Sequence, residues 1–162
     1  MSTFNGLLAH VLLVHGVVVL IPLTALLTVL CAVWPAARRR LTWLTLVLAA
    51  VSVVLIPITT DAGEWLEQRV GRTPEVHNHT QLGDTLIYFA LGVLVAAVLV
   101  AFIHIRETRS RPLGNAVIVI VAVLAVAAGA AATVQLYRIG DSGARAVWGG
   151  VASITPEPRP GK

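Results

Sequence analysis

The sequence predicts an all-α fold, a four-helix transmembrane bundle embedded in a lipid bilayer. Hydrophobic residues make up 57% of the 162 positions and charged residues only 12%, a balance too apolar for a soluble domain with a hydrated surface. The apolar residues also gather into four stretches long enough to cross a hydrocarbon core of about 30 Å, which needs roughly 20 helical residues. These predicted spans cover residues 6–34, 41–59, 82–105 and 113–137.

The first span is expected to remain in the membrane and not to act as a signal peptide. The residues before it, MSTFNG, lack the basic region of a signal peptide, and the apolar stretch is too long for its hydrophobic region. This span also holds Cys31, the single cysteine of the chain, which therefore cannot form an internal disulfide.

The arginines of two short links predict the orientation of the spans. PAARRR precedes the second span and RETRSRP precedes the fourth, and together they carry six arginines against the single Glu107. By the positive-inside rule these links face the cytoplasm. Both termini and the longer link over residues 60–81 then lie outside, which predicts a multi-pass protein of the bacterial inner membrane.

The outer link is expected to hold a short interfacial helix between spans two and three. Within TTDAGEWLEQRVGR, a possible cap at Asp61 and the spacing of the apolar residues around Trp65 suit a helix lying on the membrane surface. Residues 1–148 then form a single membrane domain without an evident internal repeat. Residues 149–162 are rich in proline and polar residues, which predicts a disordered tail.

Ionisable residues gather at the outer ends of the first and third spans. His10 and His15 enter with the first span, and His77, His79 and Asp84 lie at the start of the third. At a rise of about 1.5 Å per residue, these groups share one level of the outer leaflet. Placing such groups within a bilayer costs free energy, so they usually face the bundle interior, where they form pairs or belong to a functional site. We therefore expect a histidine-centred site there.

The spacing of the first two histidines limits which ligands the predicted site can bind. His10 and His15 lie five residues apart, so they point roughly 140° from each other around a helix and cannot bind one ion together. One of them can meet His79 across a haem b, as the two axial imidazole ligands. The alternative is a zinc or copper ion, held by a set drawn from His10, His77, His79, Asp84 and Glu64.

A non-redox interpretation stays open beside these two. The histidines can be only packed or hydrogen-bonded, or can relay protons, in a structural or transport subunit. The sequence lacks a Ser/His/Asp set, a phosphate loop and a pair of catalytic carboxylates, so it does not predict an enzyme. The string His77-Asn78-His79 lies at a membrane rim without a basic groove, which argues against nucleic acid as a partner.

Four motifs, AHVLLVHG, TTDAGEWL, HNHTQLGD and QLYRIGDSGARAVW, resemble in this order the DUF2231 family of predicted bacterial membrane proteins. That family has four spans, and its first helix carries a motif similar to H-P-x-x-V-H-F-P. By this resemblance His10 and His15 take the two histidine places, while Val11 and Gly16 stand where the family has proline and phenylalanine.

The resemblance also implies a redox association. Members sit beside or are fused to modules such as cytochrome c or Rieske domains, which implies a haem b protein with a redox partner on the outer side. Tyr137 and Arg138 belong to the final motif, where they can anchor the fourth span at the interface or reach a haem propionate. The small residues of AVAAGAAAT predict close packing of that span, in the bundle or in a homo-oligomer.

Overall fold

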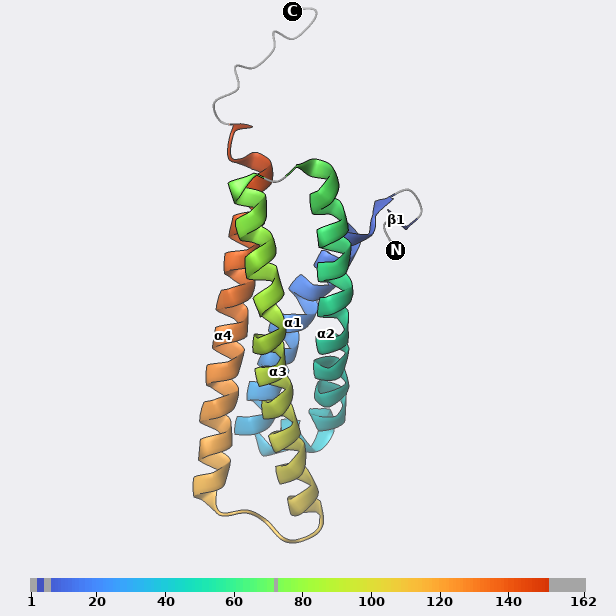
Figure 1. The fold of residues 1–162 in the computed structure, drawn as a ribbon. Coiled ribbons are helices and arrows are strands. Elements are labelled where there is room, and N and C mark those ends of the chain that lie inside the picture. Colours follow the sequence, from blue (N-terminus) through green and yellow to red (C-terminus); the bar gives the residue numbers. More distant parts are fainter. Residues whose placement is uncertain (1–2, 5–6, 72, 152–162) are drawn as a thin grey trace, which may run out of the picture.

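The chain folds into a bundle of four long helices, seen in the computed structural model of Figure 1, which describes residues 3–4, 7–71 and 73–151. Two short strands, β1 (Thr3–Phe4) and β2 (Leu7–Leu8), pair in antiparallel fashion ahead of the bundle. All four helices are long and apolar enough to cross a membrane, so the predicted all-α, four-span fold is confirmed. The helices are α1 (Ala9–Val33), α2 (Pro35–Val70), α3 (Pro74–Thr108) and α4 (Asn115–Trp148).

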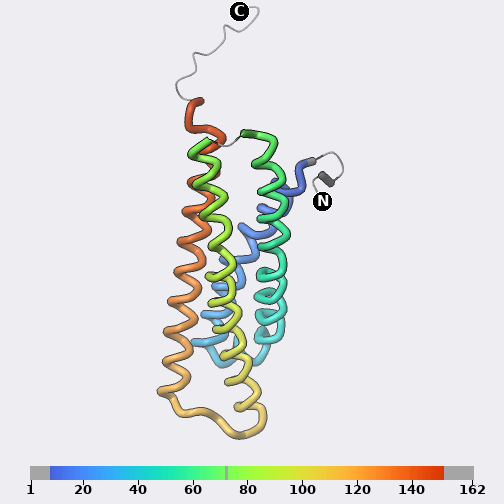
Figure 2. The backbone as a smooth tube through the Cα atoms, in the orientation of Figure 1, coloured from blue at the N-terminus to red at the C-terminus, as the bar shows by residue number. Residues whose placement is uncertain are grey.

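Successive helices run in opposite directions. The start of α1, the α2–α3 connection and the end of α4 lie at one end of the bundle, and the other two connections lie at the opposite end (Figure 2). Each helix packs mainly against two neighbours, so α1 and α3 lie diagonally across the bundle. Because α1 and α3 are parallel, their first turns meet at the same end. This topology brings the two histidine-bearing segments together.

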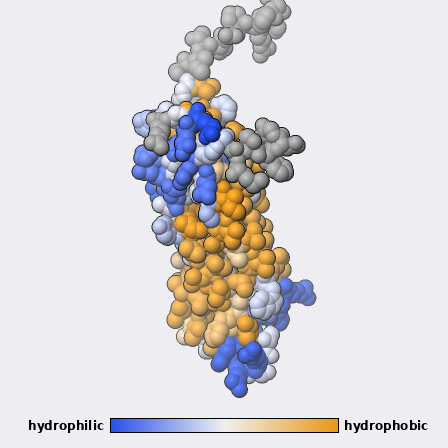
Figure 3. Space-filling view, turned by 45° about the vertical axis from the view of Figure 1, so that its right-hand side comes forward, coloured by the Kyte–Doolittle hydropathy of each residue, from blue (hydrophilic) through white to orange (hydrophobic). Residues whose placement is uncertain are grey.

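The surface of the bundle is divided by polarity. On the face seen in Figure 3, a broad hydrophobic band lies between two hydrophilic ends. The core is built largely from small residues such as Ala96 and Ala132, while large apolar side chains such as Leu26 and Val123 are exposed by 63% and 62%. Exposure of such residues over a broad band suits contact with lipid and not with water.

Three helices, α2, α3 and α4, extend beyond the apolar stretches that the sequence marks as spans, whereas α1 lies within its predicted span. The longest, α2, has 36 residues, which at a rise of about 1.5 Å corresponds to roughly 54 Å, far more than the hydrocarbon core. The separate interfacial helix was wrong: residues 60–70 continue α2 until Gly71, whose φ of 89° ends it. The predicted tail lies almost wholly outside the described residues, which end at position 151.

The connection from α1 to α2 is a single residue, Trp34, followed by Pro35 at the first position of α2. Proline suits this position because its missing N–H would have no helical partner there. A turn this short leaves carbonyl groups at the end of α1 without a helical donor. A side chain from α2 supplies the missing donors.

That side chain is Arg38, which is only 2% exposed. Its Nη1 donates to the carbonyl oxygens of Cys31 and Ala32 at 3.1 and 2.9 Å. Its Nε and Nη2 donate to the two carboxylate oxygens of Glu107, on α3, at 3.1 and 2.9 Å. One guanidinium group therefore joins three helices at the end opposite the histidines. In the sequence, Arg38 is one of six arginines in two links predicted to face the cytoplasm, and nothing there indicates its burial.

Candidate functional site

His10 lies in the first turn of α1 and is half-buried against α2. Its Nδ1 is 2.9 Å from the carbonyl oxygen of Thr59. A carbonyl only accepts, so Nδ1 is the donor, and in the neutral ring the lone pair lies on Nε2. The ring rests on Gly63, where an added Cβ would come within 2.9 Å of the imidazole.

His79 has the same environment on the other side of the bundle. It lies in the second turn of α3, and its Nδ1 is 3.1 Å from both the carbonyl oxygen of Ile139 and Oγ of Ser142. Because Ser142 itself donates to that carbonyl, the imidazole Nδ1–H is again the donor. The ring rests on Gly143, where an added Cβ would approach it to 2.9 Å.

The two rings meet between the diagonal helices. Their centroids are 6.4 Å apart and their planes are inclined by 83°. Both rings are fixed through Nδ1 by backbone carbonyls, as in many metal-ligating histidines, where such a bond sets the tautomer and raises the basicity of the other nitrogen. In both neutral rings, Nε2 is therefore the nitrogen with a lone pair available to bind a metal or accept a hydrogen bond.

Two cavities of about 300 and 380 Å³ flank the pair, and both histidines line each of them. The first is largely apolar and lies among residues such as Val14, Leu86 and Leu136. The second opens toward the polar end and has carboxylates at its edge. Gly83 lines both cavities, and a Cβ added there would meet nothing within 4 Å.

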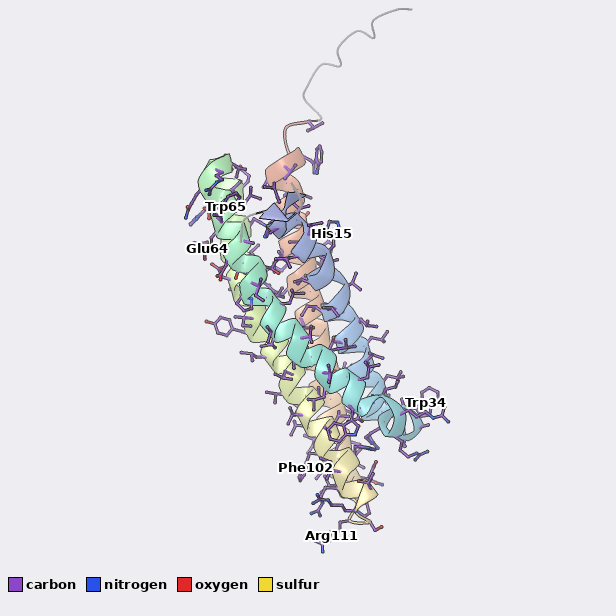
Figure 4. All side chains as sticks on the ribbon, turned by 90° about the vertical axis from the view of Figure 1, so that its right-hand side faces the viewer. His15, Trp34, Glu64, Trp65, Phe102 and Arg111 are labelled. Atoms are coloured by element: carbon purple, nitrogen blue, oxygen red, sulfur yellow. The ribbon has the colours of Figure 1, made fainter. Side chains whose placement is uncertain are left out.

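His15 is not the histidine of α1 whose ring lies beside His79. This agrees with the spacing of His10 and His15, which allows only one of the two to face the partner histidine. His15 is exposed, and its Nδ1 is 2.6 Å from the carbonyl oxygen of Val11 in its own helix. It lines the first cavity but not the second. Figure 4 shows His15 and Glu64 on opposite sides of the bundle in that view, pointing away from each other. His10, and not His15, is the histidine that meets His79.

The structure does not gather the ligands proposed for a zinc or copper ion. His77 is exposed and lies 3.0 Å, Nε2 to Nε2, from Gln81, while Asp84 and Glu64 are exposed at the edge of the second cavity. Among the described residues, no three histidine, cysteine, aspartate or glutamate side chains lie close enough to hold a metal ion together.

The residues of the final motif also lie apart from the histidine pair. Tyr137 is 74% exposed, and Arg138 is exposed with Nη1 at 3.4 Å from Oε1 of Gln135. Neither lines either cavity. Gln135 is buried instead, and its amide donates to the carbonyl of Leu82 and the hydroxyl of Thr85 at 3.2 and 2.8 Å. That amide fixes α4 against α3 just below His79.

The two glycines under the histidine rings were not among the site residues predicted from the sequence. Gly63 ends the triplet Asp61-Ala62-Gly63, and Gly143 ends Asp141-Ser142-Gly143. A shared Asp-x-Gly pattern was therefore visible, but nothing in the sequence indicated that each glycine faces an imidazole of another helix.

Comparisons with known proteins agree with the membrane architecture and with the resemblance found in the sequence. The family model described as "Predicted membrane protein (DUF2231)" matches residues 6–156, which is most of the chain. Neither the curated proteins nor the solved structures contain a significant match. The match covers all four helices and both histidines of the pair, and the chain therefore belongs to the DUF2231 family of predicted membrane proteins.

Proposed function

We propose that this membrane protein binds haem b and takes part in electron transfer, with His10 and His79 as the two axial ligands. The observation that supports this is the pair of neighbouring imidazoles from α1 and α3, each fixed by a backbone carbonyl through Nδ1. Four-helix b-type cytochromes hold haem in the same manner, between histidines that project inward from facing helices.

The separation of the rings suits this ligand. A ligating imidazole nitrogen lies about 2 Å from its metal, so two rings on opposite sides of one iron have centroids roughly 6 Å apart. The observed centroid distance is 6.4 Å. The cavities on both sides and the open space at Gly83 provide room for a flat macrocycle.

The number of ligands favours haem over a bare zinc ion. Haem iron takes its four equatorial ligands from the macrocycle, so the protein supplies only two axial groups. A zinc ion requires three or four protein ligands, and the described residues bring together no such group. The alternative of a non-redox structural or transport subunit predicts that the histidines bind no cofactor.

Haem would supply one-electron chemistry, and the protein would set its potential. The carbonyl groups of Thr59 and Ile139 hold the rings in one tautomer and leave Nε2 as the nitrogen that can bind a metal. The apolar side chains of the first cavity limit the access of water. Long packed helices keep both rings at a fixed separation.

Charge supports an orientation with both termini outside the cytoplasm, in a bacterial inner membrane. Five arginines besides Arg38 lie at the end opposite the histidines, which favours that end as cytoplasmic: Arg39, Arg40, Arg106, Arg109 and Arg111. The histidine pair then lies near the outer surface. A redox partner on that side, or a second copy of the chain, would approach the site there.

Haem titration of the purified protein in detergent tests the proposal. We expect the unmodified chain to bind one haem with a low-spin spectrum, and Gly83→Leu to weaken binding by about tenfold, because overfilling a packed site costs about 1–3 kcal/mol. Gly114→Leu is the control, because a Cβ there also meets nothing within 4 Å but lies at the opposite end. Absence of saturable binding by the unmodified chain would reject haem.

A further inference from the structure

The two helical hairpins, α1–α2 and α3–α4, build the same arrangement around their histidines. In each, the first helix supplies the imidazole and the second supplies a carbonyl that accepts from Nδ1. In each, the ring rests on a glycine four residues after that carbonyl: Gly63 after Thr59, and Gly143 after Ile139. Each glycine also ends an Asp-x-Gly triplet.

The repeat extends along the first helix of each hairpin. A shift of 69 residues places His10 on His79 and also matches six of the eight buried residues of α1 with buried residues of α3. The same shift places His15 on Asp84, so each ligand histidine is followed by an ionisable residue at the edge of a cavity. The matched buried pairs are Val17 and Leu86, Ile21 and Ala90, Thr24 and Val93, Thr28 and Ala97, Cys31 and Val100, and Ala32 and Ala101.

The second helices repeat in the same way. A shift of 80 residues places Thr59 on Ile139 and Gly63 on Gly143, and matches four of the six buried residues of α4 with buried residues of α2. These pairs are Thr45 and Ala125, Ala49 and Gly129, Ser52 and Ala132, and Ala62 and Ser142. This repeat of buried positions is not evident from the sequence. Different small or apolar residues occupy equivalent positions, so the repeat is nearly invisible as sequence identity.

The equivalent helices are parallel and diagonal, so the two hairpins are related by a pseudo-two-fold axis along the bundle. The axis passes between His10 and His79, whose rings meet there. A ligand on such an axis can bind one histidine nitrogen from each of the two hairpins. Iron in a planar macrocycle has two opposed positions of this kind.

We infer that Gly63 and Gly143 are paired positioning residues of the haem site, which the two hairpins supply as equivalent halves. The bare backbone at each glycine allows the imidazole to lie against the helix while Nδ1 reaches the carbonyl one turn earlier. A methyl group there would stand within 2.9 Å of the ring, a distance that real Cβ atoms essentially never show. The ring must then move, which shifts its Nε2 from the position that it has in the unmodified chain. This inference builds on the proposed haem site.

Separate Gly63→Ala and Gly143→Ala variants test it. Each is expected to displace one histidine, so the oxidised haem changes from low-spin to high-spin and binds at least about tenfold more weakly. Alanine favours helices more than glycine does, so a loss of fold is not expected. Gly92→Ala is the matched control, because its Cβ would meet only Ala128 at an ordinary 3.9 Å. Unchanged low-spin binding in either glycine variant overturns the inference.

A measurement without haem separates this inference from the proposed function. In protein with ¹⁵N-labelled histidine, NMR should show His10 and His79 protonated at Nδ1 in the unmodified chain. Gly63→Ala should remove that signature for His10 alone, and Gly143→Ala for His79 alone. If the unmodified chain binds no haem, the proposed function fails, yet these spectra still decide the role of the glycines. Retention of both signatures in both variants rejects it.

Discussion

Replacing His79 with alanine is expected to remove low-spin haem binding, and replacing His10 with alanine is expected to do the same. Each substitution removes one axial nitrogen and leaves the iron with a single imidazole. Loss of a group that only supports a metal ligand costs about 10–100-fold in affinity, so loss of the ligand itself should cost about 100-fold or more. Haem titration followed by absorption spectroscopy measures both the affinity and the spin state.

Two other histidines serve as controls for this prediction. His77 lies two residues from His79 on the same helix but is exposed. His15 is also exposed, and its Nδ1 is hydrogen-bonded to the carbonyl of Val11 in its own helix. Alanine at either position should leave the low-spin spectrum in place. A result in which His15→Ala loses the spectrum and His10→Ala keeps it would show that the wrong histidine of α1 has been assigned.

Replacing Glu107 with alanine is expected to lower the free energy of unfolding by about 3 kcal/mol, the low end for breaking a buried ion pair, because Glu107 is 26% exposed. The substitution leaves the Arg38 guanidinium buried with an uncompensated charge. Thermal unfolding in detergent, followed by circular dichroism, measures the effect. Arg40→Ala is the control, because Arg40 is exposed beside Arg38 in the same helix.

The double variant Arg38→Leu with Glu107→Leu separates charge from packing in this prediction. Removing both charges avoids the unpaired guanidinium, so the double variant should be more stable than Glu107→Ala alone. It still loses the two hydrogen bonds to the end of α1. If Glu107→Ala unfolds at the same temperature as the unmodified protein, the ion pair does not stabilise the bundle.

The number of helices could be predicted from the sequence because hydrophobic length alone decides how many segments can cross a bilayer. Their ends could not be predicted in the same way. Residues 60–70 are polar, so hydropathy marks the end of a span there, yet their backbone continues the hydrogen bonding of α2 to Val70. The burial of Arg38 was also hidden, because an arginine in a short basic link is ordinarily an exposed charge.

That His10 and His79 lie at the same end of the bundle was predictable, because both come at the start of a span and alternate spans of a bundle run in the same direction. The choice between His10 and His15 depended on the rotation of α1, which tertiary packing determines. The roles of Gly63 and Gly143 depended on contacts between helices far apart in the sequence. The repeated Asp-x-Gly triplets were the only signal in the sequence. They indicate a role only together with the contact between each glycine and a histidine ring.

The central claim, that His10 and His79 together ligate one haem iron, is tested most directly by near-infrared magnetic circular dichroism of the oxidised, haem-loaded protein. This spectrum distinguishes pairs of axial ligands on low-spin ferric haem. We predict the band of bis-imidazole ligation at one haem per chain, and its loss in both His10→Ala and His79→Ala. A high-spin spectrum of the unmodified protein, or a band from a different ligand pair, would contradict the claim.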